Sequence, residues 1–314
     1  MNGVSSFKID EETRMLVIDV TPEGYREDFI KSYAVTCKDT LYVIETGPRS
    51  SAEKILEVVR RLTREGIKQV KVIVTHIHLD HGGGLATIVN TLTQQGLDAK
   101  GLVHPRGLPH TVNPEKLWNA SRLVLGHIAD IYGKPEPARE DLVEPTSDGQ
   151  ILSASACNLQ LKILHTPGHA SHHQSVVLLK EGTPRVLFPG DGAGMYFPKA
   201  DAVIPTTPPP FRYDMYMKSL EKMMAYRTAY VAYTHAGVAE YNVLSRHRGQ
   251  MEIWAKVFEK LSSGVPLEAI YKTLSESDPE LKKFSEKVGD ELVVEFIKNS
   301  IAGFMEYFST KRQG

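Results

Sequence analysis

The sequence predicts a mixed α/β fold with a helical extension at its C-terminus. Over residues 1–240, strand-like segments alternate with segments of helical periodicity. Several strand-like segments end directly in histidine or aspartate, which places these residues in loops at the edge of a sheet. From Tyr241 onward, the apolar residues recur at helical spacing. We therefore expect one large α/β domain in residues 1–240 and a helical extension in residues 241–314.

The composition is that of an ordinary globular protein. The 314 residues are 41% hydrophobic and 24% charged, with a formal net charge of -1. A chain with this balance is not basic as a whole, so we expect neither a nucleic acid nor a membrane as its partner. No stretch approaches the roughly 18 apolar residues of a membrane span, and the N-terminus lacks a signal-peptide pattern.

The two cysteines indicate a reducing environment. Cys37 and Cys157 are too few for a disulfide framework, and nothing in the sequence pairs them. We interpret them as reduced thiols, which are typical of cytoplasmic proteins. The sequence therefore predicts a cytoplasmic location.

The N-terminal half contains three expected strands before its first helix. These strands are rich in β-branched and aromatic residues and cover residues 14–20, 31–39 and 40–47. A helix is expected over 50–66, where Gly66 provides a stop. The apolar run 68–75 then predicts a buried strand, and a second helix follows from Leu85 to Leu92.

Residues 101–147 differ from this pattern, with prolines near both ends and a helical middle. We predict a helical insertion that lies over the scaffold. Its residues Trp118, Arg122 and Tyr132 suggest a substrate lid, whereas the alternative is that Trp118 and Leu123 pack against the sheets.

Three further strands and a helix complete the expected domain. The strand segments "LQLKILHTPGH", "HQSVVLLK" and "PRVLFPGD" precede a proline-rich loop, a helix over 213–226 and a last strand in "AYVAYTHAG". In the extension, two helical stripes are expected, formed by Ile253, Val257 and Leu261 and by Val293, Ile297, Ile301, Phe304 and Phe308. These stripes either dock on the domain or form a homodimer.

The segment "THIHLDHGGG" follows the buried strand that ends at Thr75. His76 and His78 are two residues apart, so in extended backbone their side chains point the same way and can bind one ion. Asp80 and His81 follow where the chain bends toward a helix, and they can bind a second ion. The three glycines after them permit a sharp turn. This spacing is typical of a metal site.

Three more candidate ligands follow later strands. His169 ends "HTPGH", Asp191 ends "LFPGD" and His235 ends "VAYTH". Polar residues at strand ends beside glycine or proline are poor candidates for core packing. We therefore expect them to meet the first four at one rim of a sheet.

Together, the motif His-x-His-x-Asp-His, the distant Gly-His, the Gly-Asp and the final Thr-His resemble the metallo-β-lactamase-fold hydrolase superfamily over residues 32–237. The resemblance implies a four-layer αββα sandwich with two metal ions. His76, His78 and His169 would bind the first ion, and Asp80, His81 and His235 the second. Asp191 would bridge both ions. The acidic residue at position 191 makes the set most similar to the glyoxalase II and lactonase branch.

The resemblance also implies the chemistry. Two divalent ions would share a hydroxide that attacks a small ester, lactone or thioester. We expect these ions to be zinc, with iron or manganese as the alternatives. Asp80 would orient this hydroxide and pass a proton to the leaving group. Lactonases of this fold use a tyrosine soon after the bridging aspartate to bind the substrate carbonyl, and Tyr196 is the candidate here.

Three alternatives stay open. Persulfide dioxygenases share the motif but bind a single iron through two histidines and an aspartate. A phosphodiesterase or ribonuclease would show a clustered basic groove, whereas the lysines here are scattered. A metal-binding protein without turnover would need no substrate site.

Overall fold

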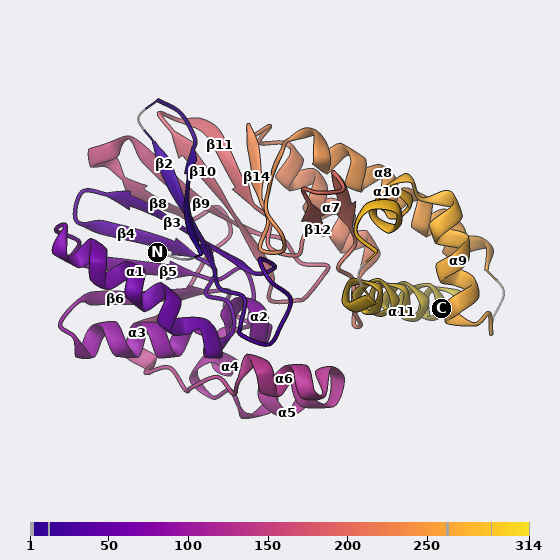
Figure 1. The fold of residues 1–314 in the computed structure, drawn as a ribbon, viewed down its shortest axis with the longest axis horizontal. Coiled ribbons are helices and arrows are strands. Elements are labelled where there is room, and N and C mark those ends of the chain that lie inside the picture. The colour runs from indigo at the N-terminus through magenta and orange to yellow at the C-terminus, as the bar shows by residue number, and fades with distance from the viewer. Residues whose placement is uncertain (1–2, 12, 262–263, 290, 314) are drawn as a thin grey trace.

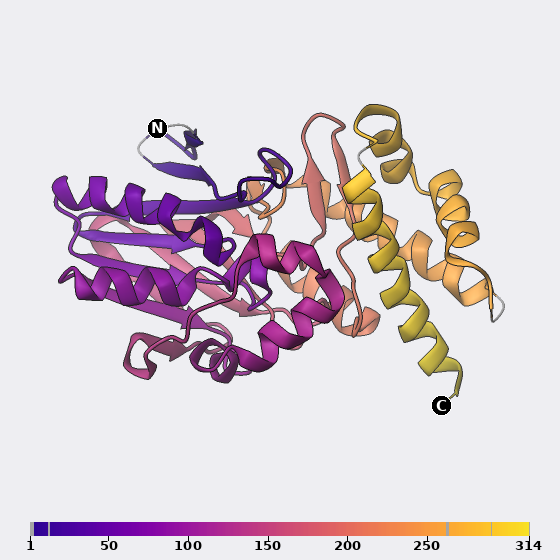
Figure 2. The same ribbon diagram turned by 60° about the horizontal axis from the view of Figure 1, so that its bottom comes forward.

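Two stacked β-sheets form the centre of the fold, with helices on both outer faces (Figures 1 and 2). The computed structural model describes residues 3–11, 13–261, 264–289 and 291–313. The layers form an αββα sandwich followed by C-terminal helices, which confirms the predicted fold class.

The first sheet has seven strands in chain order. Its strands are β1 (Val4–Lys8), β2 (Arg14–Asp19), β3 (Lys31–Cys37), β4 (Thr40–Ile44), β5 (Gln69–Ile73), β6 (Asp98–Val103) and β7 (Val143–Pro145). Strands β1 to β4 pair antiparallel, whereas β4 to β7 pair parallel. The parallel strands need helical crossovers, and the helices after β4 and β5 supply them.

The second sheet has six strands in the order β15-β14-β11-β10-β9-β8. Its bounds are β8 (Ile151–Ala154), β9 (Leu159–His165), β10 (Gln174–Lys180), β11 (Thr183–Phe188), β14 (Tyr230–Ala232) and β15 (Val238–Glu240). A separate hairpin consists of β12 (Met195–Phe197) and β13 (Ala202–Ile204). Only the β11·β14 pair of the six-stranded sheet is parallel.

The helices fall into three groups. Those that follow β4 and β5 are α1 (Ala52–Arg64), α2 (Leu79–Gly82) and α3 (Leu85–Gln94). Those between β6 and β7 are α4 (Leu108–Val112), α5 (Glu115–Leu125) and α6 (His127–Tyr132). The remaining helices are α7 (Tyr213–Met224), α8 (Asn242–Lys260), α9 (Leu267–Ser277), α10 (Pro279–Lys287) and α11 (Glu291–Gln313).

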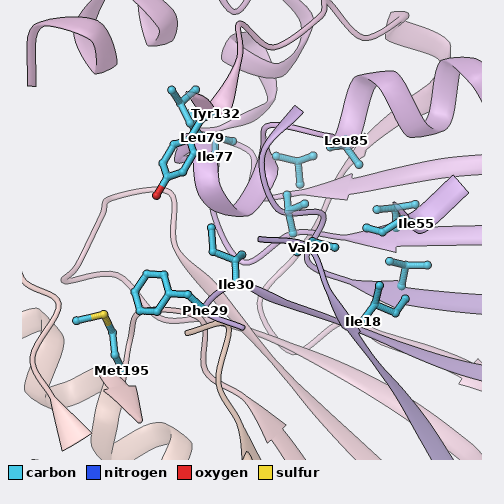
Figure 3. Close-up of a cluster of buried hydrophobic side chains, with 14 of the residues drawn as sticks. Ile18, Val20, Phe29, Ile30, Ile55, Ile77, Leu79, Leu85, Tyr132 and Met195 are labelled. Atoms are coloured by element: carbon cyan, nitrogen blue, oxygen red, sulfur yellow. The ribbon is translucent and has the colours of Figure 1, made fainter. Parts of the chain in front are cut away.

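Three hydrophobic clusters separate the layers. Strand residues alternate between the two faces of each sheet, so Val43 packs toward α1 and α3 while its neighbour Tyr42 packs toward the other sheet. In the second sheet, Val176 faces the first sheet and Val177 faces α7. Figure 3 shows part of the first cluster, where Ile55 and Leu85 from the helices lie near Val20. This alternation explains why both sheets are covered on both faces.

The stretch predicted as a helical insertion contains two strand segments. Residues 101–103 belong to β6 and residues 143–145 form β7 at the edge of the first sheet. Only the helices between them, α4 to α6, lie outside the sandwich (Figure 2). The glycine and proline residues in and after β6 are unfavourable in strands, so the sequence did not predict a strand there.

The predicted reduced cysteines are wrong, because the structure joins Cys37 to Cys157 in a disulfide. Cys37 ends β3 in the first sheet, and Cys157 lies in the turn before β9 in the second sheet. The stacking of the sheets brings their Cα atoms to 5.8 Å, which a separation of 120 residues conceals. The expected cytoplasmic location thereby loses its support from reduced thiols.

The C-terminal helices pack on the β12–β13 hairpin and on one another. The stripe of Ile297, Ile301, Phe304 and Phe308 on α11 is buried as predicted, while the side chain of Val293 lies outside the described residues. On α8, the buried face instead contains His247, Gln250, Met251, Trp254 and Phe258. The predicted residues Ile253, Val257 and Leu261 are only half-buried, because polar residues on the buried face obscured the pattern.

A buried hydrogen-bond network fastens α8. Gln250 Nε2 donates to the Val203 carbonyl of β13 at 2.9 Å and to Asp278 Oδ2 at 2.8 Å. Trp254 Nε1 donates to the same Asp278 oxygen at 2.8 Å. His247 Nδ1 lies 3.0 Å from Gln250 Oε1. These bonds hold the extension in one position against the hairpin.

None of the described helices is both long and apolar enough to span a membrane.

Acid should destabilise the protein partly through His247. Burial lowers the pKa of His247 to about 4, from an ordinary 6.5. The unfolded chain therefore binds this proton at a higher pH than the folded chain, and stability falls as the pH drops from about 6.5 to 4. Glutamine cannot take up this proton. Between pH 6.5 and 4, we therefore expect the free energy of unfolding of His247→Gln to fall by about 3 kcal/mol less than that of the wild type.

The measurement is urea denaturation at several pH values between 7 and 4 for both proteins. Substitution of the exposed His127 by glutamine is the matched control. Equal pH slopes for the wild type and His247→Gln would contradict the prediction.

Candidate metal centre

The seven residues predicted as metal ligands come together at one edge of the sandwich. His76 and His78 follow β5, and Asp80 and His81 lie on α2 directly after them. The other three follow strands of the second sheet: His169 follows β9, Asp191 follows β11 and His235 follows β14. All seven residues fall into overlapping groups of three, and within each group the ligand atoms lie within 4.8 Å of one another.

The first group consists of three imidazoles that point at one another. His76 Nε2 lies 2.9 Å from His78 Nδ1, and His169 Nε2 lies 3.2 Å from each of these two nitrogens. Three nitrogens at a metal–nitrogen distance of 2.0–2.1 Å in tetrahedral geometry are separated by about 3.3 Å. The observed triangle is therefore close to that of a zinc tripod.

The second group places Asp80 beside two histidines. Asp80 Oδ2 lies 3.5 Å from His235 Nε2 and 3.9 Å from His81 Nε2.

Asp191 lies between the two groups and faces each with a different oxygen. Its Oδ2 is 3.5 Å from His169 Nε2, while its Oδ1 is 3.3 Å from His81 Nε2 and 3.6 Å from His235 Nε2. This is the arrangement expected of a carboxylate that bridges two ions.

The hydrogen-bonding state of these side chains fits divalent cations. His81 Nε2 and Asp191 Oδ1 are buried and have no hydrogen-bond partner in the part of the chain that the structure describes. In the first group, three ring nitrogens face one another, and hydrogen bonds among them cannot give every nitrogen a partner, because each such bond needs one donor and one acceptor. A cation in each group would satisfy these atoms together, and imidazole with carboxylate suits zinc, iron or manganese.

Three of the candidate ligands are oriented by a hydrogen-bonding group on the far side of the ring. His76 Nδ1 lies 3.1 Å from the Thr75 hydroxyl. His169 Nδ1 lies 2.7 Å from the Thr206 carbonyl oxygen, and His81 Nδ1 lies 3.0 Å from Glu45 Oε1. Such contacts fix the ring orientation and leave Nε2 free for the metal.

Glu45 is a candidate functional residue that the sequence reasoning missed. It follows β4 and is only 1% exposed, and it accepts hydrogen bonds from the hydroxyls of Thr75 and Thr234. The signal was present in "YVIETG", where an acidic residue follows an apolar strand directly and precedes a glycine. A buried carboxylate needs partners of this kind, so its position was informative.

The surroundings of the first group lower the pKa values of its imidazoles and so favour their neutral form. Burial, together with the neighbouring histidines, lowers the pKa values of His76 and His78 well below 6.5. Burial also lowers the pKa of His81, but Asp191, Asp80 and Glu45 outweigh it and raise that pKa well above 6.5. Burial raises the pKa of Asp191, yet the surrounding histidines bring it below its ordinary value.

Glycines allow the close packing around the motif. A Cβ on Gly83 would collide with the Leu79 carbonyl oxygen. Gly190, which precedes Asp191, has φ +55, and a Cβ there would collide with the Thr75 hydroxyl. Both positions therefore require glycine for the ligands to converge.

Tyr196 does not lie among the ligands. Its hydroxyl donates to Asp201 Oδ1 at 3.2 Å, and its ring lies 6.0 Å from that of Tyr233 in the outer hydrophobic cluster. The expected contact between Tyr196 and a substrate carbonyl would require this arrangement to change, because β12 directs the side chain toward the charged pair of Asp201 and Arg246.

The three insertion residues have different positions. Tyr132 is 1% exposed, and Figure 3 shows it above Ile30 and Phe29. Burial raises its pKa above the ordinary value, and the nearby carboxylate of Asp80 raises it further. Trp118 is half-buried beside Arg122, whereas Leu123 is 90% exposed and does not pack on the sheets.

The comparison with known proteins identifies the family. The family model described as "Metallo-beta-lactamase superfamily" matches residues 25–235, which is more than half of the 314-residue chain. The chain belongs to the metallo-beta-lactamase superfamily.

Relatives within the superfamily are distant. The metallo-beta-lactamase fold-containing protein ST1585 of Sulfurisphaera tokodaii is 30% identical over 182 residues, which cover 57% of this chain and 65% of ST1585. The lactamase-like protein GME11357 of Pestalotiopsis microspora is 28% identical over 175 residues, or 56% of this chain and 42% of that protein. The chain thus spans less than two thirds of the length of these relatives.

Solved structures show the same fold. The crystal structure of ST1585 has a TM-score of 0.62 at 24% identity, covering 87% of this chain and 98% of that one. The metallo-beta-lactamase family protein TTHA1429 of Thermus thermophilus has a TM-score of 0.63 at 18% identity, covering 99% of this chain and 95% of that one.

Removal of single ligands should change metal content in a defined way. His76→Ala or His169→Ala removes one arm of the first group, so we expect about one ion fewer per chain. Asp191→Ala removes the carboxylate between the groups and should weaken binding of both ions. Elemental analysis after dialysis measures this, with His127→Ala as the control. Full occupancy in any ligand variant would contradict that assignment.

Substitution of Glu45 should weaken binding of the second ion more than binding of the first, because Glu45 contacts His81 directly and His76 only through Thr75. Glu45→Gln keeps the size of the side chain but removes the charge beside His81, and loss of such an outer partner lowers metal affinity by about 10- to 100-fold. Chelator competition measures the two affinities, and Glu259→Gln on the exposed side of α8 is the control. Unchanged affinity for the second ion would show that Glu45 has only a packing role.

Proposed function

We propose that the protein is a dinuclear metal-dependent hydrolase of a small ester, lactone or thioester, in the glyoxalase II and lactonase branch of the superfamily. The observation that carries the proposal is the position of Asp191, whose two oxygens face two different ligand groups. The second group of Asp80, His81 and His235 is also complete, so a second ion would have its own set of ligands.

The residues of the first group, with Asp191, would hold one ion, and those of the second group the other. Two divalent ions supply a hydroxide nucleophile at neutral pH and polarise the substrate carbonyl. Zinc suits this ligand set best among redox-inactive metals, while iron and manganese also fit it.

Asp80 is the proposed catalytic residue. Its carboxylate is less buried than the histidines around it and lies 3.5 Å from His235 Nε2. From this position it could accept the proton that a water loses on becoming the hydroxide nucleophile, and could donate that proton to the leaving group. Since neither cysteine is a free thiol and both lie away from the ligands, we propose no covalent intermediate.

A metal and substrate panel tests the proposal. We expect two zinc ions per chain and hydrolysis of at least one class among aryl esters, lactones and thioesters, because both ligand groups are complete. The protein as purified is analysed for metals, and each substrate is then assayed with both sites filled. Inactivity toward all three classes would reject the proposal.

Two other outcomes identify the alternatives. One iron per chain with oxygen uptake on a persulfide would indicate a persulfide dioxygenase. Cleavage of phosphodiesters or RNA would indicate the nuclease alternative. The cytoplasmic location, the small-molecule substrate and the homodimer stay predictions.

A further inference from the structure

A cavity of about 450 Å³ lies beside the first ligand group. His78 and His169 form part of its wall, so it opens directly onto the proposed metal centre. Its volume is in the range of sites that hold small organic molecules. The cavity therefore has the position and size of a binding site for the part of a substrate that does not react.

Two arginines give this cavity a positive charge. Arg106, from the loop after β6, and Arg212, directly before α7, both line it, and none of the aspartates and glutamates that the structure describes does. Neither guanidinium forms an ion pair in the described part of the chain. Asp214 and Glu306 line a neighbouring groove together with Arg212, but they do not line this cavity. Two arginines left without a carboxylate in one cavity can bind an anion from outside.

The chain around each arginine packs directly against a segment that contains candidate ligands. The Arg212 amide donates to the Gly168 carbonyl at 3.0 Å, next to His169. On the other side, Gly107 lies so close to Ile77 that a Cβ there would come within 2.8 Å of the Ile77 side chain. Arg106 is thus held beside the residue between His76 and His78. The backbone of both arginines is thus held next to the ligand segments, while their side chains are exposed and accessible to a ligand.

The remaining wall fits an organic anion. Pro209, Pro210 and Met215 provide apolar surface. His172 also lines the cavity, and its buried Nδ1 has no hydrogen-bond partner among the described residues. A ligand that combines a short apolar chain with a charged end would contact all of these groups.

We propose that Arg106 and Arg212 bind an oxyanion group of the substrate, a carboxylate or a phosphoryl group, and so select esters or thioesters of acidic molecules. This inference rests on the proposed hydrolase function and names its substrate class. Guanidinium groups bind both kinds of oxyanion through paired hydrogen bonds. The scissile carbonyl then lies at the metal end of the cavity.

Matched substrates test the charge preference. The 4-nitrophenyl ester of glutaric acid has a free carboxylate, its methyl ester is neutral, and 4-nitrophenyl 4-phosphonobutanoate has a phosphoryl group. We expect the zinc-loaded enzyme to prefer an anionic ester by at least about tenfold in kcat/KM. The two anionic esters distinguish a carboxylate from a phosphoryl site.

Arginine variants assign the preference to these side chains. Arg106→Gln and Arg212→Gln should each lower the ratio of kcat/KM for the acid over its methyl ester by about tenfold, and Arg212→Lys should lower it less. Arg64→Gln is the control, because Arg64 ends α1 at the opposite end of the strands from the ligands. A preference for the neutral ester, or a ratio that neither glutamine variant changes, would overturn the inference while leaving the hydrolase function intact.

A binding measurement keeps the inference independent of turnover. Calorimetric titration of the zinc-loaded enzyme with glutarate should show about tenfold weaker binding for each glutamine variant than for the wild type and Arg64→Gln. If no ester is hydrolysed but this difference is found, the anion site stands and the proposed function fails. Equal affinities in all variants would overturn the anion site itself.

Discussion

The convergence of buried imidazoles and carboxylates at the strand ends is the constraint on which the rest of this structure depends. Five histidines and two aspartates share one small volume, and their nitrogen and oxygen atoms approach to between 2.9 and 3.9 Å. Without cations, buried polar atoms at such distances are costly, because they have lost water and cannot all pair with one another. The sandwich places its loops at this edge, and the chemistry of the ligands then defines what the edge can bind.

Layers far from the ligands also hold them in position. Glu45 comes from the first sheet and orients His81, while Thr206 follows the β12–β13 hairpin and orients His169. The C-terminal extension reaches the same region, because the Tyr216 hydroxyl lies 2.7 Å from His247 Nε2 on α8 and donates to the Asp191 carbonyl at 3.4 Å. The extension therefore helps to hold the candidate metal centre in place, which its position at the end of the chain does not suggest.

The two sides of the metal centre differ in character. On the side of the second group, the Phe29 ring stacks on His235 with centroids 4.8 Å apart, and Phe296 of α11 lies 5.9 Å from Phe29. On the side of the first group lies the cavity with two arginines. Phe29 is fully buried, so on that side the aromatic rings pack against His235 as part of the core, and the cavity for the proposed substrate lies on the side of the first group.

The local sequence by itself predicted the candidate ligands and the order of the main elements. The spacing of His76, His78, Asp80 and His81 is short enough for backbone geometry to define their directions, and the glycines after them allow one kind of turn. Each of His169, Asp191 and His235 was recognisable because a polar residue ended an apolar strand. For the same reason Glu45 could have been found, since its signal is also local.

Only the tertiary structure decided the features that depend on contacts between distant segments. The disulfide between Cys37 and Cys157 needs the stacking of two sheets across 120 residues of sequence. The direction of Tyr196 depends on the pairing of β12 with β13, and the buried face of α8 depends on polar partners that no apolar pattern reveals. The meeting of Arg106 and Arg212 in one cavity likewise follows from packing, because side chains more than a hundred positions apart have no spacing that a sequence can show.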